Sequence, residues 1–227
     1  MQRALMCSAA GLALTAATAA ADPPQLKGDY AFTGEAGCLF APGSSPPAPT
    51  PAPGTPRANA GFNANLTPVD GRVFSRTHNV EGIRHFNGDG TGTVKATEVG
   101  IVPPPTPPPG GSPSFPPDAS SSTFSFSFTY AVNGDGSWTT DMVPGSYTGT
   151  ILTGPRTGQT YSVDKLSFVG LIGAGAKVLT AATVAPIVET VTYSNGDAWP
   201  RICHRSRVLV KMLSGDDDDH GGDRDRN

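Results

Sequence analysis

Four side chains capable of acid–base chemistry lie within eight residues of one another: His78, Glu81, Arg84 and His85. Histidine and carboxylate groups can transfer protons, and arginine can hold an anion. The residues around them alternate in the manner of a β-strand, in which successive side chains point to opposite faces. His78 and Arg84 therefore face one way, and Glu81 and His85 the other. With no Gly-x-Ser-x-Gly nucleophile motif in the chain, no catalytic residues are predicted and an enzyme is the minority interpretation.

A second candidate lies near the end of the chain, where side chains again alternate between two faces. One face is mostly apolar and the other is basic: Ile202, His204, Ser206, Val208, Val210 and Met212 against Arg201, Cys203, Arg205, Arg207 and Lys211. We expect the apolar face to point inward, which would place His204 in the interior as a ligand-orienting group, a base or a hydrogen-bonded core residue. The arginine face is then expected to be solvated, with binding of an anionic ligand or lipid headgroup as the alternative.

The cysteines predict one disulfide. Cys7 falls in a predicted leader, which leaves Cys38 and Cys203. Two thiols in an oxidising compartment favour a cross-link, and two sulfurs are too few for structural zinc, so no metal site is predicted. Cys38 shares an apolar face with Phe40, whereas Cys203 shares the arginine face. A bulge at Gly34 or Gly37 is expected to reconcile the two registers.

The clearest strand runs from 122 to 132, where aromatic and small polar residues alternate over five repeats. Its inward face would carry Phe124, Phe126, Phe128 and Tyr130. The strand ends at Asn133-Gly134-Asp135-Gly136, a hairpin signal because Asn and Gly tolerate positive φ. The same cassette occurs at 87–90 and, imperfectly, at 194–197. The repeated unit is thus a β-hairpin.

Further strands are expected at 28–40, 72–87, 91–102, 147–153, 159–172, 176–182, 187–194 and 201–213. No segment has the sustained apolar period of an amphipathic helix. The pattern predicts an all-β fold: an antiparallel up-and-down barrel of about 8–10 strands, with a β-sandwich as the alternative. Sequential pairing would put the Asn-Gly-Asp hairpins after the second and fourth strands at one end and the proline-rich loops after the first and third strands at the other.

The chain divides into three parts by composition. Residues 1–21 match a cleavable signal peptide, residues 22–214 are expected to form one barrel domain, and the acidic tail 215–227 is expected to be disordered. Sixteen of the 23 prolines fall in two predicted loops, 41–58 and 103–118. We therefore expect a periplasmic or extracellular protein with no transmembrane span in its mature form. The net charge of −3 argues against a nucleic-acid partner.

Three features together resemble the calycin or lipocalin-like barrels of secreted bacterial proteins: the opening Leu26 to Tyr30, the Asn-Gly-Asp hairpins, and the closing Cys203 to Arg207 strand. The resemblance implies a small-molecule cavity. In lipocalins a Trp on the first strand packs against an Arg near the end of the last strand, so the resemblance implies that Tyr30 stands in the place of this Trp, with Arg205 or Arg207 as its partner. We expect a small apolar ligand and no cofactor. The alternatives are a structural or surface-interaction protein with a filled barrel, and a cyclase-like or isomerase-like enzyme. The expected interior residues are Tyr30, Phe32, Phe124, Phe126, Phe128, Tyr130 and His204.

Overall fold

The computed structural model describes residues 25–41, 61–69, 73–103 and 118–213. The predicted signal peptide, nearly all of the two proline-rich loops and the acidic tail lie outside these residues. The described strands are β1 (Lys27–Phe40), β2 (Phe74–Asn87), β3 (Thr91–Val102), β4 (Asp118–Val132), β5 (Ser137–Met142), β6 (Thr148–Ile151), β7 (Thr160–Val163), β8 (Ser167–Ile172), β9 (Val178–Ala182), β10 (Val188–Tyr193) and β11 (Ala198–Lys211). One 3₁₀ turn, η1 (Ala174–Ala176), precedes β9.

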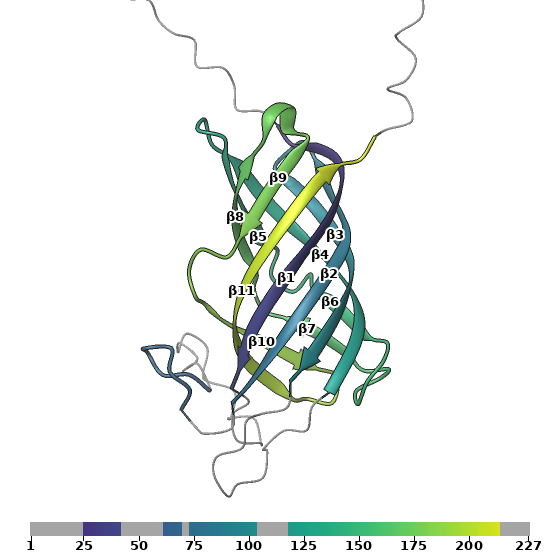
Figure 1. Ribbon diagram of the computed structural model, residues 1–227, viewed down its shortest axis with the longest axis vertical. Helices are drawn as coiled ribbons and strands as arrows, with labels where there is room; N and C mark the ends of the chain where they lie inside the picture. The colour runs from purple at the N-terminus through teal and green to yellow at the C-terminus, as the bar shows by residue number, and fades with distance from the viewer. Residues whose placement is uncertain (1–24, 42–60, 70–72, 104–117, 214–227) are drawn as a thin grey trace, which may run out of the picture.

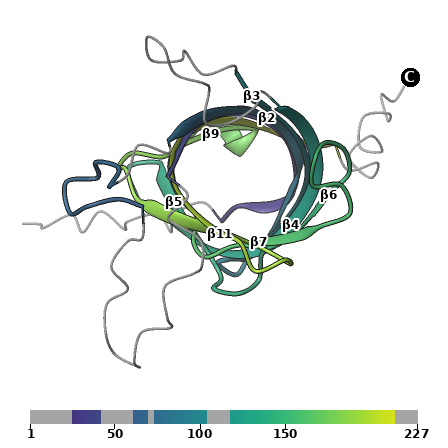
Figure 2. The same ribbon diagram turned by 90° about the horizontal axis from the view of Figure 1, so that it is seen from below.

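All described strands belong to one antiparallel sheet that closes on itself. Its order is β1-β2-β3-β4-β5-β8-β9-β11, and β11 pairs back onto β1 to complete an eight-strand ring. Viewed along its axis, the sheet forms a closed ring (Figure 2). The predicted antiparallel barrel is confirmed, and the sandwich alternative is not formed.

At two places in the barrel wall, one long strand pairs with two shorter strands in succession. β4 pairs with β5 along its second half and with β6 along its first half, and β11 divides in the same way between β9 and β10. The expected strand 159–172 is likewise split, into β7 and β8. At the break between β9 and β10, the backbone N–H of Arg205 donates to Thr183 Oγ1 at 2.7 Å, which ties the loop to β11.

The two Asn-Gly-Asp-Gly hairpins have the same pattern of internal hydrogen bonds. Asp89 Oδ1 accepts from the backbone N–H and the hydroxyl of Thr91, at 2.9 and 2.6 Å, and Asp135 binds Ser137 with the same two distances. Gly90 and Gly136 have φ of +87° and +80°, which glycine adopts without a Cβ clash. Both hairpins lie at the upper end of the barrel, as expected, and η1 lies there too (Figure 1).

Glycines on the inner wall make room for large side chains on the neighbouring strand. Gly170 lies directly opposite Trp138, and a Cβ at Gly170 would lie 2.4 Å from the indole Nε1. Gly92 stands in the same relation to the ring of Phe128. Because glycine has no side chain, each aromatic ring can occupy the space next to the backbone of the neighbouring strand. The interior therefore holds larger aromatic side chains at these positions.

The first and last strands pair in one continuous register. It runs from Tyr30 opposite Lys211 to Phe40 opposite Arg201, and the predicted bulge at Gly34 or Gly37 does not occur. Cys38 lies directly opposite Cys203 within this register. The two sulfurs form the predicted disulfide, which closes a sequence separation of 165 residues.

Candidate functional site

The disulfide decides which face of β11 points inward, and the expected orientation is wrong. Cys38 and Cys203 are both buried, so the arginines that alternate with Cys203 also face the interior. Arg201 and Arg205 are buried, whereas His204, expected inside, is exposed on the outer face. The imidazole of His204 lies against Gly37 on β1, where a Cβ would approach it to 2.4 Å. The apolar residues Val208 and Val210 lie on the outside with it.

The barrel interior contains a cavity of about 50 Å³. Its acidic and basic side chains come from three strands: Arg201, Arg205 and Arg207 of β11, His78 and Arg84 of β2, and Glu98 of β3. The remaining lining is largely aromatic and aliphatic, and it includes Phe32, Phe124, Phe126 and Phe168. A space of this size holds a few water molecules or a ligand of a few non-hydrogen atoms.

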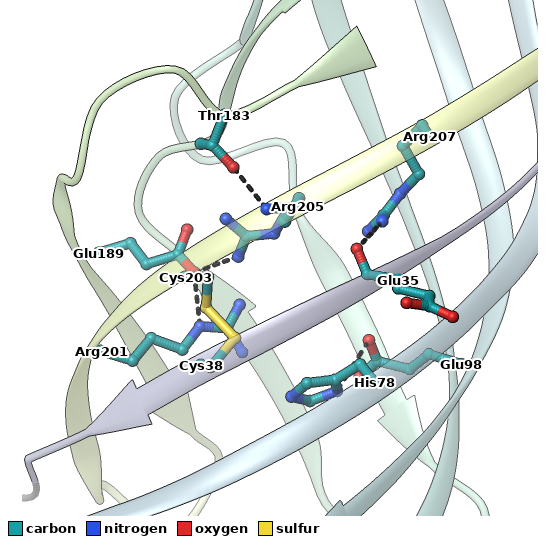
Figure 3. Close-up of a disulfide and its surroundings, with 10 residues drawn as sticks. All are labelled: Glu35, Cys38, His78, Glu98, Thr183, Glu189, Arg201, Cys203, Arg205 and Arg207. Atoms are coloured by element: carbon teal, nitrogen blue, oxygen red, sulfur yellow. Dashed lines mark hydrogen bonds and ion pairs between the residues drawn. A yellow bond between two sulfur atoms is a disulfide. The ribbon is translucent and has the colours of Figure 1, made fainter. Parts of the chain in front are cut away.

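Two of the inward arginines bind one carboxylate. Glu189 of β10 is fully buried and accepts from Arg201 Nε at 2.6 Å and from Arg205 Nη2. Figure 3 shows both guanidinium groups directed at this side chain, beside the Cys38–Cys203 disulfide. Burial alone would raise the pKa of Glu189, but the charges of Arg201 and then Arg205 outweigh it and lower the pKa. This group is a compensated ion cluster in the wall of the cavity.

Arg84 has no such compensation. Its side chain is 6% exposed, and its Nη1 has no hydrogen-bond partner among the described residues. The guanidinium instead lies on aromatic faces, with its Cζ 4.6 Å from the Phe128 ring centroid, 5.5 Å from Trp138 and 5.7 Å from Phe168. Burial, followed by the charge of Arg207, lowers the pKa of Arg84 to about 9. Arg84 is therefore a desolvated cation without a counter-ion.

Arg207 is the cation whose charge acts on Arg84 in the cavity. Its Cζ lies 5.9 Å from the same Phe168 ring. The side chain lies against the wall at Gly34, and Nη1 donates to the backbone oxygen of Glu35 at 2.6 Å (Figure 3). Burial, followed by the charge of Arg205, lowers the pKa of Arg207 to about 10. Arg84 and Arg207 thus both lie near the Phe168 ring, and within the described part of the chain neither forms an ion pair with a carboxylate.

A second polar group also lines the cavity. His78 Nδ1 is 3.6 Å from Glu98 Oε2, and Glu98 Oε1 accepts from the hydroxyls of Ser122 and Tyr161 at 3.0 and 3.1 Å. The pKa of Glu98 is lowered, because the interactions with His78, Arg201 and Ser122 outweigh the raising effect of burial. The carboxylate is therefore ionised and well solvated by protein groups.

The predicted aromatic interior residues are placed as expected. Tyr30, Phe32, Phe126 and Phe128 are buried, and Phe124 and Tyr130 pack against the same core. They also contact one another: the Phe124 and Phe126 rings stack at 6.2 Å, and both stack on Tyr147.

The predicted contact of Tyr30 with Arg205 or Arg207 is not formed. The hydroxyl of Tyr30 donates to Ala176 O in η1 at 2.7 Å, and its strand partner is Lys211.

The cluster singled out in the second strand divides as the two-residue period predicts. His78 and Arg84 line the cavity, whereas His85 lies outside and contacts Asp29 at 2.6 Å. No sequence motif marks Glu98 or Glu189, because each carboxylate acquires its role only from arginines or histidines on other strands. The alternation of Glu98 with the buried Val94, Ala96 and Val102 is the one local sign that it faces inward.

The site as a whole carries excess positive charge. Four guanidinium groups border the cavity and two carboxylates, Glu98 and Glu189, contact its lining groups. Among the described groups the positive charges exceed the negative ones by two, and Arg84 and Arg207 are the two arginines of this lining that form no ion pair with a carboxylate. An arrangement of desolvated arginines around a small space is suited to hold an oxyanion.

Fold and interior together define a class: an antiparallel β-barrel of eight ring strands with a cationic cavity. Comparisons of the chain with protein-family models, curated proteins and solved structures find no match. Across the described ranges, the structure has no helix with the length and apolar character to cross a membrane.

Proposed function

We propose that this protein is a binding module for a small oxyanion, which it holds inside the barrel between Arg84 and Arg207. The observation that carries the proposal is the state of Arg84: a buried cation whose Nη1 has no partner in the described structure. Burying an unpaired charge costs several kcal/mol. Binding of an anion beside Arg84 would offset this cost. The oxygen atoms of a carboxylate, phosphate or sulfate match the hydrogen-bond donors of arginine.

The aromatic surroundings strengthen this assignment. Phe128, Trp138 and Phe168 hold the guanidinium of Arg84 in place through their ring faces and exclude water from it. An anion that enters such a site meets preorganised donors in a low dielectric, where charge-assisted hydrogen bonds are stronger than at the surface.

Calorimetric titration of the folded protein with acetate, phosphate and sulfate tests the proposal. We expect saturable binding of one anion per chain, weakened about tenfold or more in Arg84→Met because a hydrogen-bonded charge pair is lost. Lys95→Met is the matched control, since Lys95 is exposed on the outer face and should leave the affinity unchanged. Absence of saturable binding for all three anions would overturn the proposal.

A structural or surface-interaction protein with a filled barrel is the second candidate. The observation that favours it is the volume: about 50 Å³ against the several hundred Å³ of pockets that enclose larger ligands. The same volume weighs against the lipocalin-like alternative, in which the barrel takes up an apolar molecule. Titration with an apolar fluorescent probe separates them, because saturable one-to-one uptake would support the lipocalin-like alternative and contradict a filled barrel.

We further propose that the protein works outside the cytoplasm. The disulfide Cys38–Cys203 supports this, because such cross-links persist in oxidising compartments. Mass spectrometry of the protein recovered from its native cell fractions tests it. A chain that begins near residue 22 in the periplasmic or external fraction is the expected result, and an intact leader on cytosolic protein would contradict it.

A further inference from the structure

The outer wall of the barrel carries an exposed apolar patch across neighbouring strands. Val178 of β9 pairs with Val210 of β11, which pairs on its other side with Ala31 of β1. Ala31 pairs with Ile83 of β2, so this row of side chains crosses four strands that lie side by side in Figure 1. With the two apolar residues of the next row on the same face, the outer patch consists of Ala31, Ile83, Leu171, Val178, Val208 and Val210.

The exposure and continuity of the outer patch mark it as an interaction surface. Its five large side chains are 43–63% exposed. Elsewhere the outer wall is polar: from 121 to 129 the outer face of β4 carries only serine and threonine. Contiguous exposed apolar side chains indicate a surface that binds another molecule, whereas single ones need no explanation.

Charged residues border the outer patch, with lysines on one side and glutamates on the other. Lys177 and Lys211 lie together at the η1 end, where the backbone N–H of Lys211 donates to Lys177 O at 2.8 Å. Glu35 pairs with Ser206 of β11 and so lies on the far side of the patch. Glu81 lies near it on the neighbouring strand β2. All four charged side chains are exposed, and none forms an ion pair with another residue in the described ranges.

We infer that a second copy of this chain packs on the outer patch and forms a two-fold dimer. A two-fold axis that runs along the patch, in the plane of contact, brings each patch onto its counterpart. The same rotation sets the lysine side of one copy against the glutamate side of the other, because the two borders lie on opposite sides of the axis. The surface is thus complementary to itself in apolar contact and in charge. The inference does not depend on the proposed anion site, which lies inside the barrel.

The charge pattern favours a second copy over a lipid surface. An anionic membrane attracts lysine and repels glutamate, so Glu35 and Glu81 would oppose contact with it. The lysines of a second copy instead offer these carboxylates opposite charges.

Sedimentation velocity of the full chain tests for the dimer. We expect the wild type to pass from monomer to dimer between about 1 and about 100 μM, and Val210→Asp to dimerise at least about tenfold more weakly, because its carboxylate would be buried among apolar side chains. Val99→Asp is the matched control and should dimerise like the wild type. Val99 of β3 is 49% exposed against 51% for Val210, and it lies outside the outer patch. A wild type that stays monomeric throughout, whether or not it binds vesicles containing phosphatidylglycerol, would overturn the inference, as would equal weakening by both Asp substitutions.

Two charge-reversed variants test the two-fold arrangement. Glu35→Lys/Glu81→Lys makes both borders basic, and Lys177→Glu/Lys211→Glu makes both borders acidic. Each variant alone should dimerise more weakly than the wild type, because like charges then face each other. An equimolar mixture should restore the dimer as a heterodimer, and this rescue also shows that both variants are folded. A mixture that associates no better than the separate variants would contradict the two-fold packing.

Discussion

Gly34 lies directly opposite Arg207 in the pairing of β1 with β11, and the missing side chain at Gly34 is what allows Arg207 to lie against the inner wall. A Cβ at Gly34 would lie 2.6 Å from Arg207 Cδ and 2.1 Å from the backbone oxygen of Ser206. Gly34 has no side chain, yet it determines where the guanidinium of Arg207 lies in the barrel.

Gly34→Ala should therefore reduce both stability and anion affinity. Overpacking against a backbone atom cannot be relieved by a rotamer change, and we expect a loss of about 1–3 kcal/mol in the free energy of unfolding. Denaturant unfolding and calorimetric titration with acetate measure the two effects. Gly134→Ala is the control, because a Cβ there meets nothing within 4 Å. Equal behaviour of the two variants would contradict the close contact.

Arg84→Met and Arg205→Met should change stability in opposite directions. Arg84 is buried without a counter-ion, so replacing it with an apolar side chain of similar length should raise the free energy of unfolding by about 1–4 kcal/mol. Arg205 shares Glu189 with Arg201, so its replacement removes one of two hydrogen bonds to a buried carboxylate and should cost about 1.5–3 kcal/mol. Thermal unfolding without added anions distinguishes the two. A loss of stability in Arg84→Met would mean that this arginine has a structural partner.

Acid should destabilise the barrel in two steps. The pKa of His78 lies below its ordinary value of 6.5, so the unfolded chain takes up a proton first as the pH falls below about 6.5, and stability begins to decline there. The pKa values of Glu98 and Glu189 lie below their ordinary value of 4.5. Their contribution is complete above about pH 4.5 and is lost as the pH falls further. Denaturant midpoints between pH 7 and pH 3 measure both steps, and His78→Phe should remove the first one only.

The disulfide should contribute substantially to stability. It closes a span of 165 residues, for which the chain-entropy relation gives about 5 kcal/mol as an upper value. The double variant Cys38→Ala/Cys203→Ala should therefore unfold at a much lower denaturant concentration than the oxidised wild type. Adding a reductant should shift the wild type toward the variant and leave the variant unchanged. A wild type that does not respond to complete reduction would contradict a stabilising cross-link.

The strands and turns of this protein follow from local sequence. The alternation from Phe124 to Tyr130 predicts a strand with one buried face, and the structure has β4 there with those rings packed in the core. The Asn-Gly-Asp cassettes predict hairpins because glycine tolerates positive φ and Asp binds the residue two positions on. These are short-range effects, so the order of residues along the chain contains all the information they need.

The sequence by itself thus determined the strands, the hairpins, the barrel class and the cysteine pair. Tertiary structure alone decided which face of β11 points inward. A two-residue period defines two faces without saying which is buried, and the valines at 208 and 210 made the wrong one the more apolar. The arginines are buried because Glu189 on β10 supplies a countercharge, Gly34 on β1 supplies space, and Phe168 on β8 supplies a ring face. These partners come from three other strands, and only closure of the barrel brings them together.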